Sequence, residues 1–388
     1  MGNTTQLEFF SQEELIKKIG LDSTLWHGSF NGLESTLNQL SPYVGKLKSG
    51  MVQVLISLYS TKGDTVLDPF SGSGVVPFMS ALMGRQAYAN DLSPYAYVLT
   101  RAKLETPYLK SQAVDAAIRL LDKVETIAPS ISLDEVPDWI QSFFHPKTLQ
   151  ELIVAFQLLQ EHQSYFLLAC LLGILHHQRP GFLSYPASHL VPYLRKSKYP
   201  QEDYPEMYQY RDVRSRLLSK IKRAYRRHEL PVDWKNRHYK IWQTNSMNLP
   251  VNDQQVDAII SSPPYFGALD YARDNRLRLW FLGCKNWKEL DQNLTANSKV
   301  YIPQMSACIK EMYRILKPKK YCILVLGDVE RDNKTHRTAE ILAEVANNVT
   351  NNGFTIDTIY DDIIPDERRS RRKTKTTKFE RILVMRRK

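Results

Sequence analysis

The chain has 388 residues, 43% of them hydrophobic, so it can bury one large core or a core plus a smaller inserted domain. Its longest apolar run, Tyr165–Leu175, is much shorter than the roughly 20 residues that a membrane-spanning helix needs. The first ten residues lack the basic, apolar and cleavage-site segments of an export signal. We therefore expect no membrane anchor and a cytoplasmic location.

The net charge of +11 and the isoelectric point of about 9.3 favour a polyanionic partner. Lysine and arginine gain free energy when they displace the counterions condensed on a phosphate backbone. Charges that merely keep a basic protein in solution are the alternative. The four cysteines lie far apart and show no paired ligand spacing, so we expect reduced thiols and no metal site.

The first part of the chain has the pattern of a nucleotide-binding βαβ unit. A short strand at 64–67 leads into a glycine-bearing turn at 68–74, which is followed by an apolar helix at 75–83. A second strand at 86–89 then runs into Asp91. Strand, glycine loop, helix, strand and acid follow one another in the order typical of this unit.

The periodicity becomes helical after residue 104. Segments 111–128, 146–162 and 164–177 each predict a helix, and 206–228 predicts a strongly basic one. We therefore expect residues 105–240 to form a largely helical, basic inserted domain. The parts on either side, 1–104 and 241–388, are expected to form one catalytic domain.

Alternating strands and helices return in the last third. The sequence predicts strands at 256–260 and 321–326 and helices at 304–316 and 338–349. Two final strands, 354–360 and 379–385, are expected to pair antiparallel. The fold class expected overall is α/β, a Rossmann-like doubly wound sheet interrupted by the helical insert.

The glycine loop is the first candidate site. Gly72 and Gly74 remove side chains where the backbone must turn sharply and approach a ligand closely. The carboxylate of Asp91 can accept hydrogen bonds from both ribose hydroxyls of a nucleoside. The alternatives are a plain strand-to-helix turn and a helix-capping role for Asp91, and glycine spacing alone does not identify the ligand.

The second candidate site is the segment 259–265, Ile-Ile-Ser-Ser-Pro-Pro-Tyr. Pro263 and Pro264 fix the backbone and remove two donors, which leaves carbonyl groups free to accept hydrogen bonds. An exocyclic amino group is a poor nucleophile, because its lone pair is delocalised into the ring, and two rigid acceptors localise that pair. Ser262 Oγ and the Pro263 carbonyl are candidates for these acceptors, and the Tyr265 ring is a candidate surface for stacking a flipped base. A plain proline turn is the alternative.

Together the two motifs resemble those of the amino-methyltransferases of DNA, which make N4-methylcytosine or N6-methyladenine. The resemblance covers residues 41–102 and 240–388 and implies the class I methyltransferase fold with S-adenosylmethionine as cofactor. It assigns the catalytic role to Ser262, Pro263, Pro264 and Tyr265. The cofactor-binding residues that it implies are Asp68, Pro69, Phe70, Gly72, Gly74, Asp91, Asn245, Tyr43 and Lys46. At Asn245 the family often has aspartate, but asparagine still accepts through its amide oxygen.

The order of the motifs, with the cofactor loop before the insert and the catalytic loop after it, is similar to the family's α arrangement. This order makes the insert the expected target-recognition region and double-stranded DNA the expected partner, with a cognate restriction endonuclease as a possible second one. Serine at the first position of the catalytic motif favours the N4 atom of cytosine over the N6 atom of adenine. The DNA contacts predicted from the basic helix are Arg211, Arg214, Lys222, Arg223, Arg226 and Arg227. A solvated basic helix over an aromatic core is the alternative.

The sequence is also compatible with two other kinds of function. Related Pro-Pro-Tyr loops serve other planar amines, so RNA or a protein glutamine is an alternative substrate. A non-catalytic DNA-binding subunit of a restriction or defence complex is the alternative of a different class. No metal is expected, since methyl transfer from a sulfonium needs none.

Overall fold

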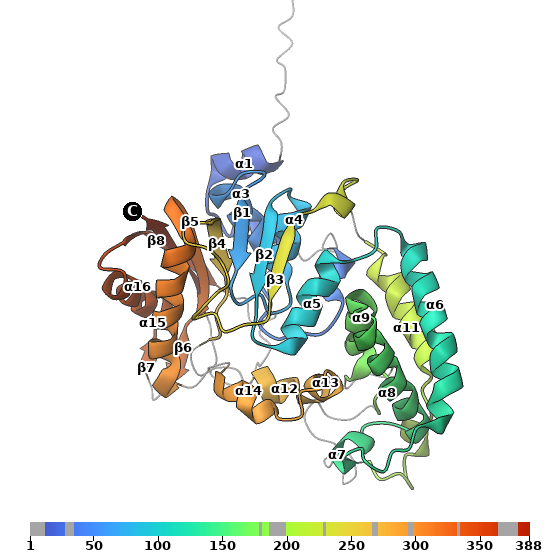
Figure 1. The fold of residues 1–388 in the computed structure, drawn as a ribbon. Helices are drawn as coiled ribbons and strands as arrows, with labels where there is room; N and C mark the ends of the chain where they lie inside the picture. The colour runs from blue at the N-terminus through green and yellow to red at the C-terminus, as the bar shows by residue number, and fades with distance from the viewer. Residues whose placement is uncertain are drawn as a thin grey trace, which may run out of the picture.

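A seven-stranded sheet forms the centre of the protein in the computed structural model (Figure 1). The order of its strands is β3-β2-β1-β4-β5-β9-β8, and the first five run parallel, whereas β9 is antiparallel to both of its neighbours. The structure describes residues 12–27, 35–177, 181–185, 199–227, 230–265, 271–293, 298–331, 334–363 and 379–388. The basic stretch of sequence at 368–378 lies outside the described residues.

The central strands are short and apolar, as expected for parallel strands that are covered on both faces. The seven strands of the sheet are Thr65–Asp68 (β1), Gln86–Asn90 (β2), Tyr239–Trp242 (β3), Val256–Ser261 (β4), Leu316–Gly327 (β5), Phe354–Ile363 (β8) and Phe379–Arg387 (β9). A separate hairpin pairs Val329–Arg331 (β6) with Lys334–His336 (β7).

Successive strand residues point to opposite faces, so the sheet has a core on each side. Val66 and Ile260 pack in the core that α3 (Ser49–Tyr59) and α4 (Val75–Leu82) share, and α5 (Pro94–Leu104) packs against α4. The neighbouring Leu67 and Ile259 belong to the core under α15 (Ser298–Ile315) and α16 (Thr338–Val349). The doubly wound α/β fold is therefore confirmed.

The helices of the insert are grouped beside the β3 edge of the sheet, on the side away from β8 (Figure 1). They are α6 (Lys110–Ile127), α7 (Asp138–Gln141), α8 (Pro146–Glu161), α9 (Tyr165–Leu175) and α11 (Val213–Ala224). The apolar α9 packs against α5, which joins the insert to the catalytic part. The shorter helices are α1 (Gln12–Ile19), α2 (Thr24–His27), α12 (Tyr271–Asp274), α13 (Arg276–Phe281) and α14 (Trp287–Asn293), with 3₁₀ turns at Thr36–Gln39, Ala128–Ser130, Pro205–Tyr208 and Trp234–Asn236.

Two elements differ from the sequence-based expectation. The basic helix predicted over 206–228 extends only over Val213–Ala224, because Asp212 caps its start by accepting a hydrogen bond from the Ser215 amide. The edge strand β3 is not predicted at all, since it is only four residues long and none of them is buried. The domain boundary predicted at residue 240 falls inside this strand.

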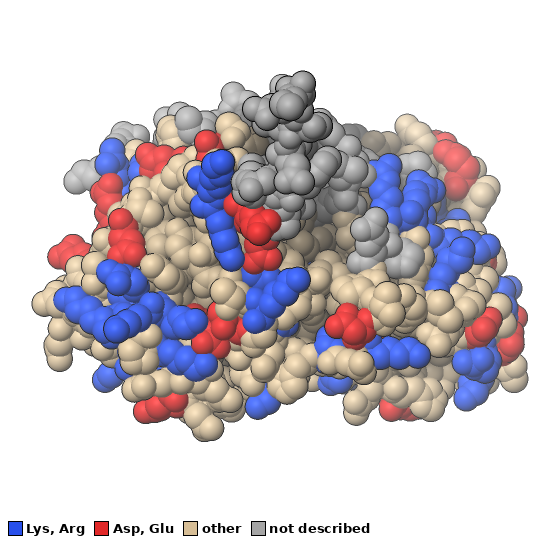
Figure 2. Space-filling model, turned by 90° about the horizontal axis from the view of Figure 1, so that it is seen from above, with Lys and Arg blue, Asp and Glu red and all other residues tan. Residues whose placement is uncertain are grey.

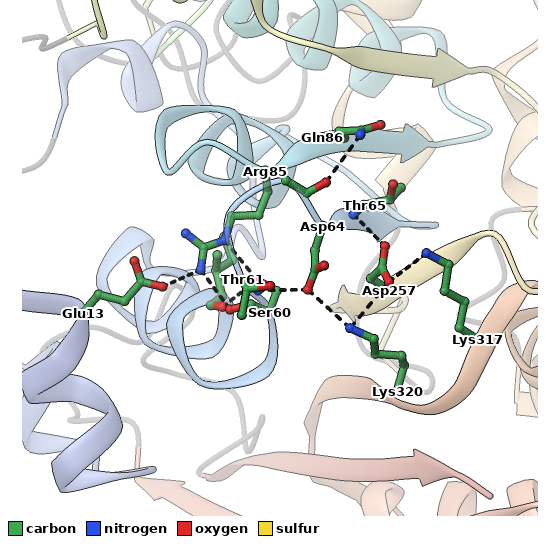
Figure 3. Close-up of polar contacts among 12 residues, drawn as sticks. Glu13, Ser60, Thr61, Asp64, Thr65, Arg85, Gln86, Asp257, Lys317 and Lys320 are labelled. Atoms are coloured by element: carbon green, nitrogen blue, oxygen red, sulfur yellow. Dashed lines mark hydrogen bonds and ion pairs between the residues drawn. The ribbon is translucent and has the colours of Figure 1, made fainter.

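Charged side chains connect neighbouring strands at the end of the sheet where the parallel strands begin (Figure 3). Asp257 Oδ2 accepts a hydrogen bond from the Thr65 amide at 3.1 Å, and Lys317 Nζ donates to Asp257 Oδ1 at 2.8 Å. Lys320 Nζ reaches both Asp257 and Asp64. On the face that carries α1, basic and acidic side chains are interspersed (Figure 2). Within the described ranges no helix is long and apolar enough to cross a membrane.

Candidate active site

A cavity opens at the carboxyl ends of the central strands, which is where parallel α/β sheets bind ligands. Its walls come from the loops after β1 and β2, the segment 45–47, the turn at 245–247 and the start of α15. Ser262 and Pro264, from the loop after β4, line the same cavity. Parts of both motifs predicted from the sequence therefore line one cavity, whereas Pro263 and Tyr265 are buried outside its lining.

Glycine is required in the loop after β1. Gly72 and Gly74 both have positive φ, +50° and +76°, which other residues adopt only with strain. A Cβ at position 72 would lie 3.1 Å from Tyr43 Cε1, and one at position 74 would lie 2.8 Å from Thr100 Cα. The first contact keeps the loop against the Tyr43 ring, and the second lets α4 begin directly beside α5.

Asp68 and Asp91 are the carboxylates at the ends of β1 and β2. Asp68 is only 2% exposed, and its Oδ1 accepts a hydrogen bond from the Phe70 amide at 3.1 Å. Asp91 accepts from the amides of Gly72 at 2.8 Å and Ser93 at 2.9 Å. Asp91 thus holds the glycine loop in place in addition to lining the cavity, and each of its oxygens retains a further lone pair for a ligand.

Burial raises the pKa of both carboxyl groups. The pKa of Asp68 rises from 3.8 to about 7, opposed by the hydrogen bonds that it accepts and increased further by the charge of Asp91. The pKa of Asp91 rises from 3.8 to about 6 for the same main reason. Two buried carboxyl groups with raised pKa values beside one cavity are a feature typical of functional sites.

Asn90 is a residue of this site that the sequence reasoning missed. Its Nδ2 donates to the carbonyls of Pro69 at 3.3 Å and Thr244 at 3.0 Å, and its Oδ1 accepts from the Thr244 amide at 3.0 Å. Ser246 Oγ also donates to the Pro69 carbonyl, at 2.7 Å. Asn90 therefore fixes the turn that carries Asn245 against the glycine loop. The only sequence signal was a polar residue at the end of an apolar strand.

The weaker cofactor candidates also lie at the cavity. Tyr43 lines it, and burial together with the nearby Asp91 raises the pKa of its phenol well above the usual value. Lys46 lines it too, and its Nζ donates to the Asn38 carbonyl at 3.2 Å. Asn245 lines it and accepts from the Met247 amide through Oδ1 at 3.0 Å.

The catalytic loop follows β4 directly. Ser261, the last residue of the strand, donates from Oγ to Asp68 Oδ1 at 2.5 Å, so the loop starts in a fixed position relative to the glycine loop. Pro263 is buried and lies outside the cavity lining. The Tyr265 side chain is 9% exposed, and its hydroxyl donates to Glu380 Oε1 at 2.7 Å.

The predicted DNA contacts fall into two sets. Arg211 donates to the carbonyls of Phe182 and Ser184, and Arg214 pairs with Asp122 and Glu125. These two arginines therefore hold the insert together, which a basic sequence pattern does not reveal. The others lie exposed at the end of α11 or just beyond it, and they are Lys222, Arg223, Arg226 and Arg227.

In the described part of the chain, no group of three or more histidine, cysteine, aspartate or glutamate side chains is placed to hold a metal ion.

The sequence of this chain is similar to those of DNA methyltransferases. A family model described as DNA methylase, covering N6- and N4-methyltransferases, matches residues 25–101. The type II methyltransferase M.BsoBI of Geobacillus stearothermophilus is 25% identical over 309 residues, which are 68% of this chain and 57% of the relative. Both matches support the DNA amino-methyltransferase family.

A second relative and several solved structures show weaker similarity to this chain. The type II methyltransferase M.MjaII of Methanocaldococcus jannaschii is 26% identical over 34% of the chain and 25% of the relative. TrmN from Thermus thermophilus covers 91% of this chain at 10% identity, with 52% of its own chain aligned and a TM-score of 0.36. A putative DNA modification methylase, also from Thermus thermophilus and complexed with S-adenosylmethionine, is 17% identical over 37% of this chain and 53% of its own, with a TM-score of 0.23.

The cofactor of the DNA amino-methyltransferases is S-adenosylmethionine, and the cavity of this chain suits it. Gly72 lines the cavity without a side chain, so a ligand can lie against its backbone. Asp68 and Asp91 supply acceptors for hydroxyl and amino groups, and Phe70 and Met247 supply apolar surface. The chain spans 57% and 25% of the lengths of the two curated relatives that it matches.

Proposed function

We propose that the protein transfers a methyl group from S-adenosylmethionine to the exocyclic amino group of a base in double-stranded DNA, with the N4 atom of cytosine as the preferred target. The observation that carries the proposal is that Ser262 and Pro264 line one cavity together with the glycine loop and Asp91. A cofactor bound at the glycine loop and a base held by the catalytic loop would then be neighbours.

In this proposal the chain holds and orients the two reactants. Asp91, Phe70 and Asn245 hold the nucleoside part of the cofactor, which supplies a methyl group on a sulfonium. Ser262 Oγ and the Pro263 carbonyl accept hydrogen bonds from the two hydrogens of the target amine. These bonds would localise the nitrogen lone pair toward the methyl group, so that the N–C bond would form in line as the S–C bond breaks, without a covalent enzyme intermediate. S-adenosylhomocysteine would be the leaving group, and one amine proton would be lost to solvent.

Tyr265 supplies the surface for the flipped base. A base inside a duplex cannot reach the cavity, so the nucleotide must leave the stack at a cost of a few kcal/mol. Stacking on an aromatic ring contributes about 1–3 kcal/mol per base, which offsets much of that cost. Tyr265 is suited to this role because it ends the catalytic motif and its hydroxyl already has a partner in the protein.

Serine at position 262 supports cytosine as the target, through the resemblance of the motif to N4-cytosine enzymes. The relatives carry the names of type II methyltransferases, and we extend the proposal to a cognate restriction endonuclease that recognises the same DNA sequence.

The substrate is tested by methyl transfer from radiolabelled S-adenosylmethionine to duplex DNA, tRNA and a protein extract. We expect label in DNA alone, and label in tRNA or protein instead would overturn the proposal. DNA from a host that expresses the protein is then sequenced by a method that separates N4-methylcytosine from N6-methyladenine. N6-methyladenine at the modified sites would refute the choice of cytosine.

The role of the catalytic loop is tested with Ser262→Ala. We expect the single-turnover rate to fall by about a hundredfold, as for the loss of one preorganised hydrogen-bonding group, with unchanged affinity for S-adenosylhomocysteine. Thr350→Ala, which removes a hydroxyl at the end of α16, is the matched control. A Ser262→Ala protein that binds cofactor and keeps the full rate would contradict the proposed role.

A further inference from the structure

Glu380 contacts the catalytic loop from outside both sequence motifs. It is the second residue of β9 and lies 115 positions after Tyr265, whose hydroxyl donates to its Oε1 at 2.7 Å. Burial raises the pKa of the Glu380 carboxyl group. A tyrosine that is 9% exposed and a half-buried glutamate thus satisfy each other's hydrogen-bonding groups.

The surroundings of Glu380 are themselves fixed. Asp362 lies opposite Glu380 in the β8–β9 register and is fully buried. It accepts hydrogen bonds from Lys48 Nζ at 3.2 Å, Trp26 Nε1 at 3.1 Å and His27 Nε2 at 2.6 Å. The positive charge of Lys48 also acts on Glu380 and opposes the rise in its pKa. Glu380 therefore lies on a strand, next to the Asp362 carboxylate that three hydrogen bonds hold in place, whereas Tyr265 lies on a loop.

We infer that Glu380 is a positioning residue that fixes the plane of the Tyr265 ring through the phenolic hydroxyl and so presents the ring face to the target base. This inference rests on the proposed function, in which Tyr265 stacks the flipped base. Stacking requires a defined ring plane, and a tyrosine on a loop has two side-chain torsions that must be fixed. A hydrogen bond at the far end of the ring restrains both torsions.

The inference also gives a reason for tyrosine at the last position of the motif. A phenylalanine there would offer an equal stacking surface but would leave the Glu380 carboxyl group buried without this donor. The hydroxyl is thus needed for orientation and has no part in the transfer itself. Lys48, which donates a hydrogen bond to Asp362, directly follows Leu47, which lines the cofactor cavity. The segment that lines the cavity is therefore connected to the strand pair that carries Glu380.

The experiment compares Glu380→Ala, Glu380→Gln, Tyr265→Phe and the double variant Tyr265→Phe/Glu380→Ala on the DNA that wild type methylates. We expect Glu380→Ala to lower kcat by about tenfold or more, with affinity for S-adenosylhomocysteine within about twofold of wild type by calorimetry. Glu380→Gln keeps an acceptor and should recover most of kcat. In the Tyr265→Phe background, Glu380→Ala should cause no further loss, since the two residues act through one contact.

A readout that is independent of activity accompanies the kinetics. The chain is labelled with 3-fluorotyrosine, and the ¹⁹F resonance missing from Tyr265→Phe is assigned to Tyr265. In Glu380→Ala this resonance should shift and narrow as the ring gains freedom, whereas Asp357→Asn, which removes a carboxylate paired with Arg386 on the same strand pair, should leave it unchanged. Thermal unfolding of each variant separates a loss of positioning from a loss of folding.

Two results would overturn the inference. One is wild-type kcat and an unchanged resonance in Glu380→Ala, and the other is an equal loss of kcat from Glu380→Ala in both backgrounds. Failure of the proposed function would be seen differently, as wild-type protein that labels no DNA while the resonance still responds to Glu380→Ala.

Discussion

Ser261 Oγ donates a hydrogen bond of 2.5 Å to Asp68 Oδ1 across 193 residues of sequence. Ser261 is the last residue of β4 and Asp68 is the last residue of the neighbouring parallel strand β1. The bond joins the two points from which the catalytic loop and the glycine loop begin. The helical insert lies between them in sequence, yet it does not disturb their relative position.

Ser261→Ala should destabilise the protein and weaken cofactor binding. The substitution removes one of the donors to a carboxyl group that is 2% exposed, and losing a partner of a buried polar group costs about 1–3 kcal/mol. Urea unfolding and calorimetric titration with S-adenosylhomocysteine measure the two effects. Thr350→Ala, which also removes a hydroxyl, should change stability less and binding not at all. Equal binding by Ser261→Ala and wild type would contradict the coupling of the two loops.

Asn90→Ala should cause a larger loss, because Asn90 bridges the glycine loop and the turn at 244–246 with both ends of its amide. We expect a decrease of about 2 kcal/mol or more in the free energy of unfolding, together with weaker cofactor binding. Asn90→Asp is the informative companion, since it keeps the acceptor for Thr244 but places an oxygen against two carbonyls. Asn90→Asp should therefore fail as well, and wild-type binding by this variant would show that the donors are unimportant.

The sequence predicts the parts of the site that follow from local pattern. A glycine loop after an apolar strand, an acid after the next strand and the Ser-Pro-Pro-Tyr segment are all readable in one dimension, and the structure brings Asp68, Asp91 and Ser262 to one cavity. The antiparallel pairing of β8 and β9 is confirmed as well. The motifs depend on neighbouring residues along the chain. The pairing of β8 with β9 depends on the order of the strands, and the rules of chain connection allow few such orders.

The residues missed from the sequence act through contacts between distant segments. Asn90, Ser261 and Glu380 have partners 154, 193 and 115 positions away, so no local pattern marks them. The same reason explains why the sequence did not separate the two sets of arginines in and beside the basic helix, since all of these cations look alike in the sequence. Only the folded insert shows that Arg214 faces two acids of α6.

Stability should depend on pH through Asp68. The pKa of this carboxyl group is about 7 in the folded protein and 3.8 in a model compound, so the folded state binds more protons than the unfolded state between these values. The contribution of Asp68 to the free energy of unfolding therefore decreases as pH rises through that interval, by at most about 1.4 kcal/mol per pH unit. Asp68→Asn removes this dependence but keeps an acceptor for Ser261 and Phe70. Relative to wild type, the variant should gain stability from about pH 4 to about pH 7 in urea unfolding, and a difference that is constant with pH would refute the assignment.

The two sets of arginines should differ in their effect on DNA binding. Arg223 and Arg226 are exposed, and no described residue forms an ion pair with either of them, so Arg223→Ala/Arg226→Ala should weaken binding. The slope of the logarithm of affinity against the logarithm of salt concentration should decrease in magnitude by up to about 2, because each lost phosphate contact removes about 0.9. Arg214→Ala should leave this slope unchanged, and because its ion pairs with Asp122 and Glu125 are exposed it should cost less than about 1 kcal/mol of stability. Fluorescence anisotropy over a salt series measures the slopes. A slope altered more by Arg214→Ala than by the double substitution would place the DNA on the α6 side of α11 instead.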